Sequence, residues 1–223
     1  MRITILTAAL LATGGAQAQN ACATGATLED GRLTIATGNP AYYPWVLNDA
    51  PEAGEGFESA VAYAVAAEMG FDADQVDWVR TSFDQSIQPG AKNFDFNLQQ
   101  FSITEDRERM VDFSLPYYSS AMAVLATGDA VEAGAAPTLD SLRGLRWGAD
   151  ANTTAVPMLT QLIDPERQPM LYGDNTDVTA AMQAGQIDAA LFDLPTALYL
   201  SAVVVAGGVI LGQFPPERSE SPD

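Results

Sequence analysis

The sequence contains no histidine and a single cysteine, Cys22. Histidine-dependent catalytic triads, cysteine–histidine nucleophile pairs and the common zinc sites all need residues that are missing here. The acidic run Asp72-x-Asp74-x-x-Asp77 superficially suggests a calcium loop, but its sixth position lacks the glycine that the EF-hand turn requires. We therefore expect no metal and no cofactor.

Basic residues are also scarce. Ten lysines and arginines face 29 aspartates and glutamates, which gives a formal net charge of −19, and Lys92 is the one lysine. A chain this acidic is repelled by nucleic acids and by anionic membrane surfaces. The sequence therefore argues against nucleic-acid binding.

Long apolar runs are missing apart from a short one at the start. Arg2 precedes the apolar stretch 3–12, and Ala16-Gln17-Ala18 has the small-x-small pattern of a signal peptidase site. This stretch is too short to span a membrane. We predict a signal peptide over residues 1–18, cleaved after Ala18, and a periplasmic protein. Cys22 lacks the preceding residues of a lipoprotein signal, so we expect no lipid anchor.

Predicted strands and helices alternate along the chain, which favours an α/β fold with mostly parallel sheets and a ligand site at the strand carboxyl ends. The expected strands are 33–37, 76–80, 94–99, 145–149, 169–172, 187–192 and 209–214, and the expected helices are 56–69, 104–110, 138–142, 153–162 and 175–184. The low-complexity stretch 127–137 separates two such series. We therefore expect two lobes with a cleft between them.

The segment Phe101–Tyr118 carries the clearest functional signal. Thr104 is a good helix N-cap, and Arg107 follows in the first turn. Exposed N–H groups at a helix start, together with a guanidinium aimed at the same place, form a receptor for a carboxylate. The simpler alternative is a charged surface helix whose Arg107 points into water, and Thr-x-x-Arg alone would favour that alternative.

The order Ser-Ile-Thr-x-x-Arg, then Val-Asp-Phe-Ser and Pro-Tyr-Tyr, resembles the amino-acid-binding proteins of bacterial ABC importers, extracellular solute-binding family 3. Further segments that resemble the family are Gly56-Phe57-Glu58, Leu142-Arg143-Gly144 and Ile187–Asp193. The resemblance implies a two-lobed periplasmic binding protein type II fold with the ligand cleft between the lobes. Lobe 1 is expected over 28–124, lobe 2 over 125–207, and a second crossover with a polar tail over 208–223.

The resemblance also implies ligand contacts from both lobes. Lobe 1 would bind the ligand carboxylate through Arg107, Ser102 and the N–H groups near Thr104, and would stack Tyr42 on the ligand. Lobe 2 would bind the carboxylate through Thr153 and Thr154 and the ammonium group through Asp193. Helix capping is the simpler explanation for 152–154, and it is plausible for Asp193 as well.

Three features depart from the family pattern or lie outside it. Gln100 stands where relatives usually carry a small residue, and if it faces the cleft it favours a ligand with a polar side chain. Tyr43 and Trp45 are expected to pack on lobe 1. The family's chain returns to lobe 1 after the second crossover, whereas this sequence ends at 215–223. We therefore expect the rest of lobe 1 to be missing, an unpaired Cys22, exposed apolar surface, weak stability and poor ligand closure.

Together these features predict the exported, monomeric binding component of an ABC importer, which delivers a polar L-amino acid to a membrane permease. One alternative is an enzyme on the same fold, such as a periplasmic cyclohexadienyl dehydratase, with Glu58 or Asp193 as a general acid. A sensor domain and a truncated relative that does not bind ligand are the others.

Overall fold

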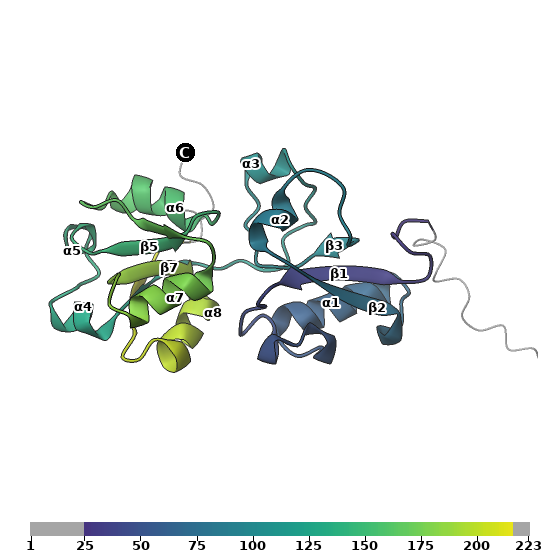
Figure 1. Cartoon of the computed structure of the whole chain (residues 1–223), viewed down its shortest axis with the longest axis horizontal. Coiled ribbons are helices and arrows are strands. Elements are labelled where there is room, and N and C mark those ends of the chain that lie inside the picture. Colours follow the sequence, from purple (N-terminus) through teal and green to yellow (C-terminus); the bar gives the residue numbers. More distant parts are fainter. Residues whose placement is uncertain (1–24, 216–223) are drawn as a thin grey trace, which may run out of the picture.

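The computed structural model describes residues 25–215, which form two α/β units beside one another along the long axis (Figure 1). The predicted signal peptide, its cleavage site, Cys22 and most of the predicted polar tail lie outside these residues. No helix within the described range is long and apolar enough to cross a membrane.

The first unit is built on a three-stranded parallel sheet of order β2-β1-β3. Its strands are β1 (Leu33–Gly38), β2 (Val76–Thr81) and β3 (Phe96–Asn97), and its helices are α1 (Phe57–Glu68), α2 (Phe83–Ile87) and α3 (Glu105–Glu108). Leu33 and Ile35 of β1 pack against Ala62 and Ala66 of α1 in the core. The sheet therefore rests on α1, while α2 lies on its other side (Figure 1).

The second unit is built on a five-stranded sheet of order β6-β5-β7-β4-β8. Its strands are β4 (Met122–Ala126), β5 (Trp147–Asp150), β6 (Met170–Tyr172), β7 (Ala189–Asp193) and β8 (Val209–Gln213). Its helices are α4 (Gly128–Glu132), α5 (Leu139–Arg143), α6 (Ala155–Met158), α7 (Asn175–Gln183) and α8 (Leu194–Tyr199). Strand β7 is apolar throughout its buried part because it serves cores on both faces: Ala190 and Phe192 pack on one side, Ala189 and Leu191 on the other.

Short turns of other helix types complete the structure. The 3₁₀ helices are Leu47–Asp49, Pro51–Ala53 and Ala73–Gln75, and the π-helical turns Leu159–Ile163 and Leu200–Val204 extend α6 and α8. Strands β5, β6 and β7 are parallel, whereas β4 runs antiparallel to both β7 and β8. The mostly parallel sheets that the sequence predicts are confirmed, with β4 as the antiparallel member.

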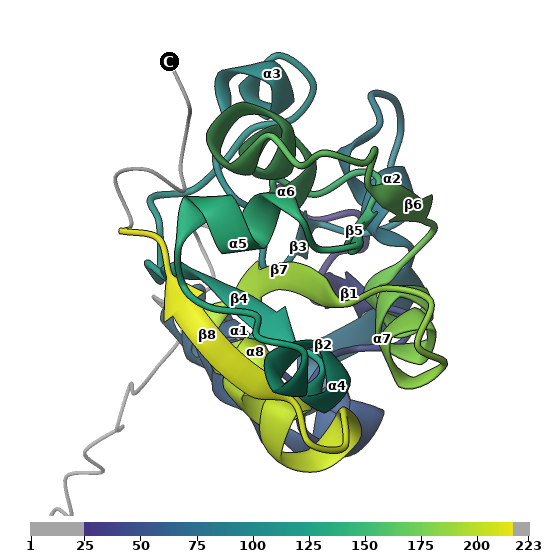
Figure 2. The same cartoon turned by 90° about the vertical axis from the view of Figure 1, so that its left-hand side faces the viewer.

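Strand β8 lies at the sheet edge next to β4 (Figure 2). The N–H of Phe214 donates to the carbonyl of Met122 (2.8 Å), so the chain entering the sheet at β4 and the chain leaving it after β8 run side by side. The predicted strand 209–214 is thus present as β8. The lobe bounds at 28–124 and 125–207 stay a prediction.

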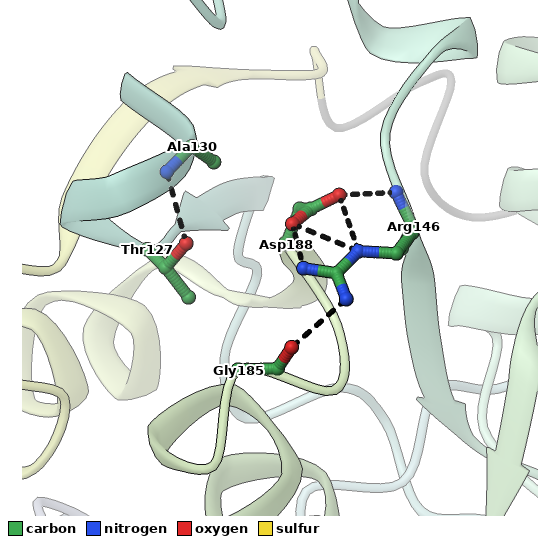
Figure 3. Close-up of polar contacts among 5 residues, drawn as sticks. All are labelled: Thr127, Ala130, Arg146, Gly185 and Asp188. Carbon is green, nitrogen blue, oxygen red and sulfur yellow. Dashed lines mark hydrogen bonds and ion pairs between the residues drawn. The ribbon is translucent and has the colours of Figure 1, made fainter. Parts of the chain in front are cut away.

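Two polar contacts fix the ends of second-unit elements (Figure 3). The hydroxyl oxygen of Thr127 accepts from the N–H of Ala130 (3.2 Å) and caps α4, so a helix begins inside the low-complexity stretch 127–137. Asp188 accepts from the backbone N–H (2.8 Å) and Nη2 (2.6 Å) of Arg146, whose Nη1 also donates to the carbonyl of Gly185 (2.9 Å). This pair joins the start of β5 to the start of β7.

Candidate functional site

A cavity of about 340 Å³ lies between the two units and takes its walls from both. Seven of the eight residues predicted to bind a ligand line it: Tyr42, Gln100, Ser102, Arg107, Thr153, Thr154 and Asp193. The eighth, Thr104, does not line the cavity. Its hydroxyl oxygen instead accepts from the N–H of Arg107 (3.3 Å) as the N-cap of α3, which confirms the predicted cap.

Arg107 is the buried cation of this cavity, with 7% of its surface exposed. Its Nη1 donates to the carbonyl of Ser102 (2.9 Å), and its Nη2 donates to the carbonyl of Asn152 (2.8 Å) in the other unit. Its guanidinium carbon lies 5.3 Å and 5.6 Å from the ring centres of Phe83 and Phe101. The alternative of an arginine pointing into water is therefore wrong.

Burial lowers the pKa of Arg107, and the nearby Asp150 carboxylate acts in the opposite direction. An arginine keeps its proton under such conditions. None of the six ion pairs among the described residues includes Arg107. The cavity thus contains a fixed positive charge whose direct contacts among the described residues are carbonyl oxygens and aromatic rings, while the Asp150 carboxylate acts on it from beyond ion-pair distance.

The segment after β5 forms a tight turn before α6. The N–H of Asn152 donates to Oδ1 of Asp150 (3.0 Å), and the hydroxyl of Thr153 donates to the carbonyl of Asp150 (2.9 Å). Thr154 stands at the N-cap position of α6, but its side chain makes no capping hydrogen bond. The Thr154 side chain therefore has no capping role in the structure. The hydroxyl of Thr153, by contrast, is already occupied by its hydrogen bond to Asp150.

Asp193 ends β7 and begins α8. Its Oδ1 accepts from the N–H of Thr196 (3.0 Å), so the helix cap considered in the sequence analysis is present. Asp193 also lines the cavity. It can cap α8 and bind a ligand at once if Oδ1 accepts from Thr196 and Oδ2 contacts the ligand. Burial raises the pKa of Asp193, while hydrogen bonds from Thr196 lower it.

Gln100 contacts the carboxylate of Glu58, a residue that the sequence suggests only as the general acid of an enzyme. Its backbone is left-handed, with φ of 53°, and its N–H donates to Oε1 of Glu58 (2.8 Å), while its side-chain nitrogen donates to Oε2. The hydroxyl of Tyr117 donates to Glu58 as well. Gln100 thus belongs to a polar cluster around the buried Glu58 at the cavity wall.

Aromatic residues of the loop after β1 reach the second unit. The hydroxyl of Tyr42 lies 3.4 Å from that of Thr176, the ring of Tyr43 stacks on Tyr199 at 4.2 Å, and Nε1 of Trp45 donates to the hydroxyl oxygen of Thr196 (2.9 Å). The prediction that Tyr43 and Trp45 pack on lobe 1 is incomplete: Trp45 contacts Phe57 of its own unit, and both residues also contact the second unit. Packing propensity alone did not reveal these contacts, because their partners lie more than a hundred residues further along the chain.

A second, larger hollow of about 1080 Å³ lies beside β3 and shares Gln100, Ser102, Thr154 and Asp193 with the cavity. Its walls include large apolar side chains with exposed surface, among them Leu115, which is 89% exposed. Exposed apolar surface in this unit agrees with the expectation from the sequence. Weak stability and poor closure stay predictions.

Comparison with known proteins finds a matching family model and similar binding proteins. The family model described as bacterial extracellular solute-binding proteins, family 3, matches residues 33–185. The lysine/arginine/ornithine-binding periplasmic protein of Escherichia coli K12 is 31% identical over 126 residues, which are 52% of this chain and 44% of the relative. The chain spans about half the length of the curated relatives it matches, 44% and 53% in two of them.

Solved structures add the fold. An L-arginine-bound substrate-binding protein of an amino-acid ABC transporter from Streptococcus pneumoniae is 28% identical, with a TM-score of 0.65 over 82% of this chain and 78% of that one. The ancestral amino-acid-binding protein AncCDT-1, a precursor of cyclohexadienyl dehydratase, is 27% identical, with a TM-score of 0.63 over 82% and 80%. The predicted type II periplasmic binding protein fold is thereby confirmed.

Proposed function

Because the chain belongs to the bacterial extracellular solute-binding proteins, family 3, we propose that it is the binding component of an ABC importer and holds a polar L-amino acid in the cavity between its units. The relatives that match it are binding proteins of this kind. The names of these relatives support an amino acid as the ligand, and the residues that line the cavity support binding at this site.

The observation that carries the proposal is the buried Arg107 without a carboxylate partner among the described residues. A buried charge is costly unless it is paired, so the site favours an anion that completes the guanidinium. The α-carboxylate of an amino acid fits, because it accepts charge-assisted hydrogen bonds from a guanidinium and can also reach Ser102 and Thr154 at the same cavity wall.

The ammonium group of the ligand would pair with Asp193, whose Oδ1 caps α8 and whose other oxygen is left for the ligand. Tyr42, which lines the same cavity, supplies an aromatic face for the ligand stem and its positive charge. We further propose that the protein is monomeric and periplasmic and releases its ligand to a membrane permease, as the family resemblance implies. Cleavage after Ala18 rests on the sequence pattern of residues 16–18.

Catalysis has less support than binding. One similar solved structure is a precursor of a dehydratase, but it is itself an amino-acid-binding protein. Of the two candidate general acids, Glu58 lines the larger hollow and not the cavity that contains Arg107, and Asp193 lines both but already caps α8. We therefore propose a binding protein, not an enzyme.

Titration calorimetry with the proteinogenic L-amino acids tests the proposal. We expect Arg107→Ala to weaken binding by about 30-fold or more, because truncating one partner of a buried charge pair costs about 2–5 kcal/mol. The matched control is Arg109→Ala, because Arg109 is exposed on the same short helix and pairs only with its helix neighbours. Undiminished binding by Arg107→Ala would remove the carboxylate role, and a wild-type chain that binds none of the amino acids would support a non-binding relative.

A further inference from the structure

Three carboxylates remain in the cavity wall after Arg107 and Asp193 are assigned to the ligand's α-groups. Asp84 comes from α2 of the first unit, Asp150 from the end of β5, and Asp174 from the N-cap of α7. Arg107 is the one basic side chain among the described residues that line the cavity. The wall therefore carries an excess of negative charge that the α-groups of an amino acid do not neutralise.

Asp150 is the most informative of the three, because only 4% of its surface is exposed. Its Oδ1 accepts from Asn152, and among residues 25–215 no hydrogen bond reaches Oδ2, although that oxygen is not sealed inside the protein. Burial raises the pKa of Asp150; the Asn152 N–H and Arg107 lower it, and the carboxylates of Asp174 and Asp84 raise it. Asp84 and Asp174 thus act on Asp150 across the cavity.

Neither of the other two carboxylates has a cationic partner. Oδ1 of Asp174 accepts from the N–H groups of Thr176 (2.6 Å) and Asp177 (3.0 Å), and Oδ2 of Asp84 accepts from the side-chain amide of Gln88 (2.7 Å). The six ion pairs in the described part of the chain include none of the three. A cation that enters the cavity therefore meets unpaired negative charge from both units.

A metal ion does not explain this charge. Within the described residues no group of three or more acidic, histidine or cysteine side chains is close enough to hold a metal ion. An extended organic cation suits spread carboxylates better, because a guanidinium or ammonium on a flexible stem can contact oxygens that do not converge on one point. Tyr42 at the same wall offers an aromatic face for such a cation.

We infer that Asp150, with Asp84 and Asp174, selects an amino acid whose side chain carries a guanidinium or ammonium group. This inference rests on the proposed function, since it assigns the side chain of a ligand whose α-groups Arg107 and Asp193 hold. With a neutral side chain, Asp84 and Asp174 have no counter-charge, and Asp150 has only Arg107, which the α-carboxylate also uses. An acidic side chain is repelled by all three.

The sharpest test compares L-arginine with L-citrulline, which has nearly the same shape but an uncharged ureido group. Titration calorimetry of the unmodified chain should give L-arginine an affinity at least about tenfold higher, because hydrogen bonds to charged groups contribute more than neutral ones. L-Lysine and L-ornithine should also bind more tightly than L-glutamine. The preference for arginine should shrink as the salt concentration rises.

Variants then locate the selectivity. Asp150→Asn should bring the arginine-to-citrulline ratio close to one, and Asp84→Asn, on the other unit, should lower it in part. The matched control is Asp140→Asn, because Asp140 is exposed in the first turn of α5 and does not line the cavity. Thermal unfolding of each variant identifies any loss of binding that comes from loss of the fold.

The outcomes separate the two proposals. If citrulline or glutamine binds the unmodified chain as tightly as arginine, the side-chain assignment is overturned while amino-acid binding stands. If none of these amino acids binds but another proteinogenic L-amino acid does, only the side-chain assignment is overturned. If no proteinogenic L-amino acid binds, both proposals are overturned. If arginine is preferred but Asp150→Asn and Asp84→Asn retain the full ratio, the selectivity does not come from this wall and the inference is also overturned.

Discussion

Glu58 shows how the interior near the cavity controls a single titratable group. Only 1% of its surface is exposed, and its carboxylate accepts from Tyr117 and Gln100. Burial raises the pKa of Glu58 from 4.5 to about 7, the hydrogen bonds from Tyr117 and Gln100 oppose this change, and Asp193 adds to it. The proton of Glu58 is therefore gained or lost close to neutral pH.

This pKa predicts how stability depends on pH. Between about pH 4.5 and 7 the folded protein holds the Glu58 proton while the unfolded chain has lost it, so the free energy of unfolding falls as pH rises and levels off above about 7. The loss across this window is about 3 kcal/mol. Urea unfolding from pH 5 to 8 should show a shallower slope for Glu58→Gln than for wild type. Equal slopes would contradict the prediction, and Glu52→Gln, at an exposed site, is the control.

Individual residues were predictable where their partners are close in the sequence. Thr104 and Arg107 lie in one helical turn, so the cap could be inferred from the pattern alone. Gln100 and Tyr117 meet Glu58 over separations of 42 and 59 residues, and nothing in the local sequence indicates that contact. Asp150, at the end of a predicted strand, was detectable in principle, because a carboxylate in that position of a parallel sheet faces the ligand side.

At the scale of elements, the Arg146–Asp188 pair stabilises the junction of β5 and β7 (Figure 3). Burial acts to raise the pKa of Asp188, but the hydrogen bonds from Arg146 outweigh it and hold that pKa below its usual range. The resulting stabilisation is present above the pKa of the unfolded chain and is lost as pH falls through the lower folded value.

We expect Asp188→Asn to lower the free energy of unfolding at pH 7 by about 1–3 kcal/mol, because it removes a charged acceptor from several hydrogen bonds. Urea unfolding measures this directly. The matched control is Asp106→Asn, whose ion pair with Arg109 is exposed and is expected to contribute little. If both variants lose a similar amount of unfolding free energy, the Asp188 contacts do not stabilise the protein more than an exposed ion pair does.

The sequence predicted the helices and strands that have strong apolar patterns, but it did not predict those with weak patterns. The core strands β1, β5 and β7 fall where expected. Strand β3 covers only Phe96–Asn97 of the predicted 94–99, and the chain turns at the left-handed Gln100 that follows. Helices α2 and α4 were not predicted, and each depends on one capping hydroxyl, Ser82 and Thr127, rather than on a long apolar face.

At the scale of the whole molecule, the two units and the cavity between them follow from the order of the elements, whereas the bridging residues do not. The bond from Trp45 to Thr196 and the stack of Tyr43 on Tyr199 join the units beside the cavity. Arg107 adds a third link through the carbonyl of Asn152. These contacts favour the arrangement in which the cavity is enclosed.

Trp45→Phe should make this arrangement less populated. The ring can keep its contacts with Phe57 and Tyr118, but the N–H that donates to Thr196 is removed. We expect ligand affinity to fall by about two- to tenfold, as loss of one net hydrogen bond implies, and the ligand-free radius of gyration to rise. Calorimetry and small-angle X-ray scattering measure the two effects. Trp78→Phe is the matched control, since its indole bonds Tyr63 within the first unit; an equal effect there would refute the bridging role.

The position of Trp45 also gives the protein its own optical probe. The chain has three tryptophans; Trp78 lies within the first unit, and Trp147 is enclosed in the core of the second with 1% of its surface exposed. Trp45 alone has its indole bonded across the boundary between the units. Separation of the units would bring water to this indole and leave the other two unchanged. The fluorescence of the unlabelled protein can therefore report opening and closing in real time.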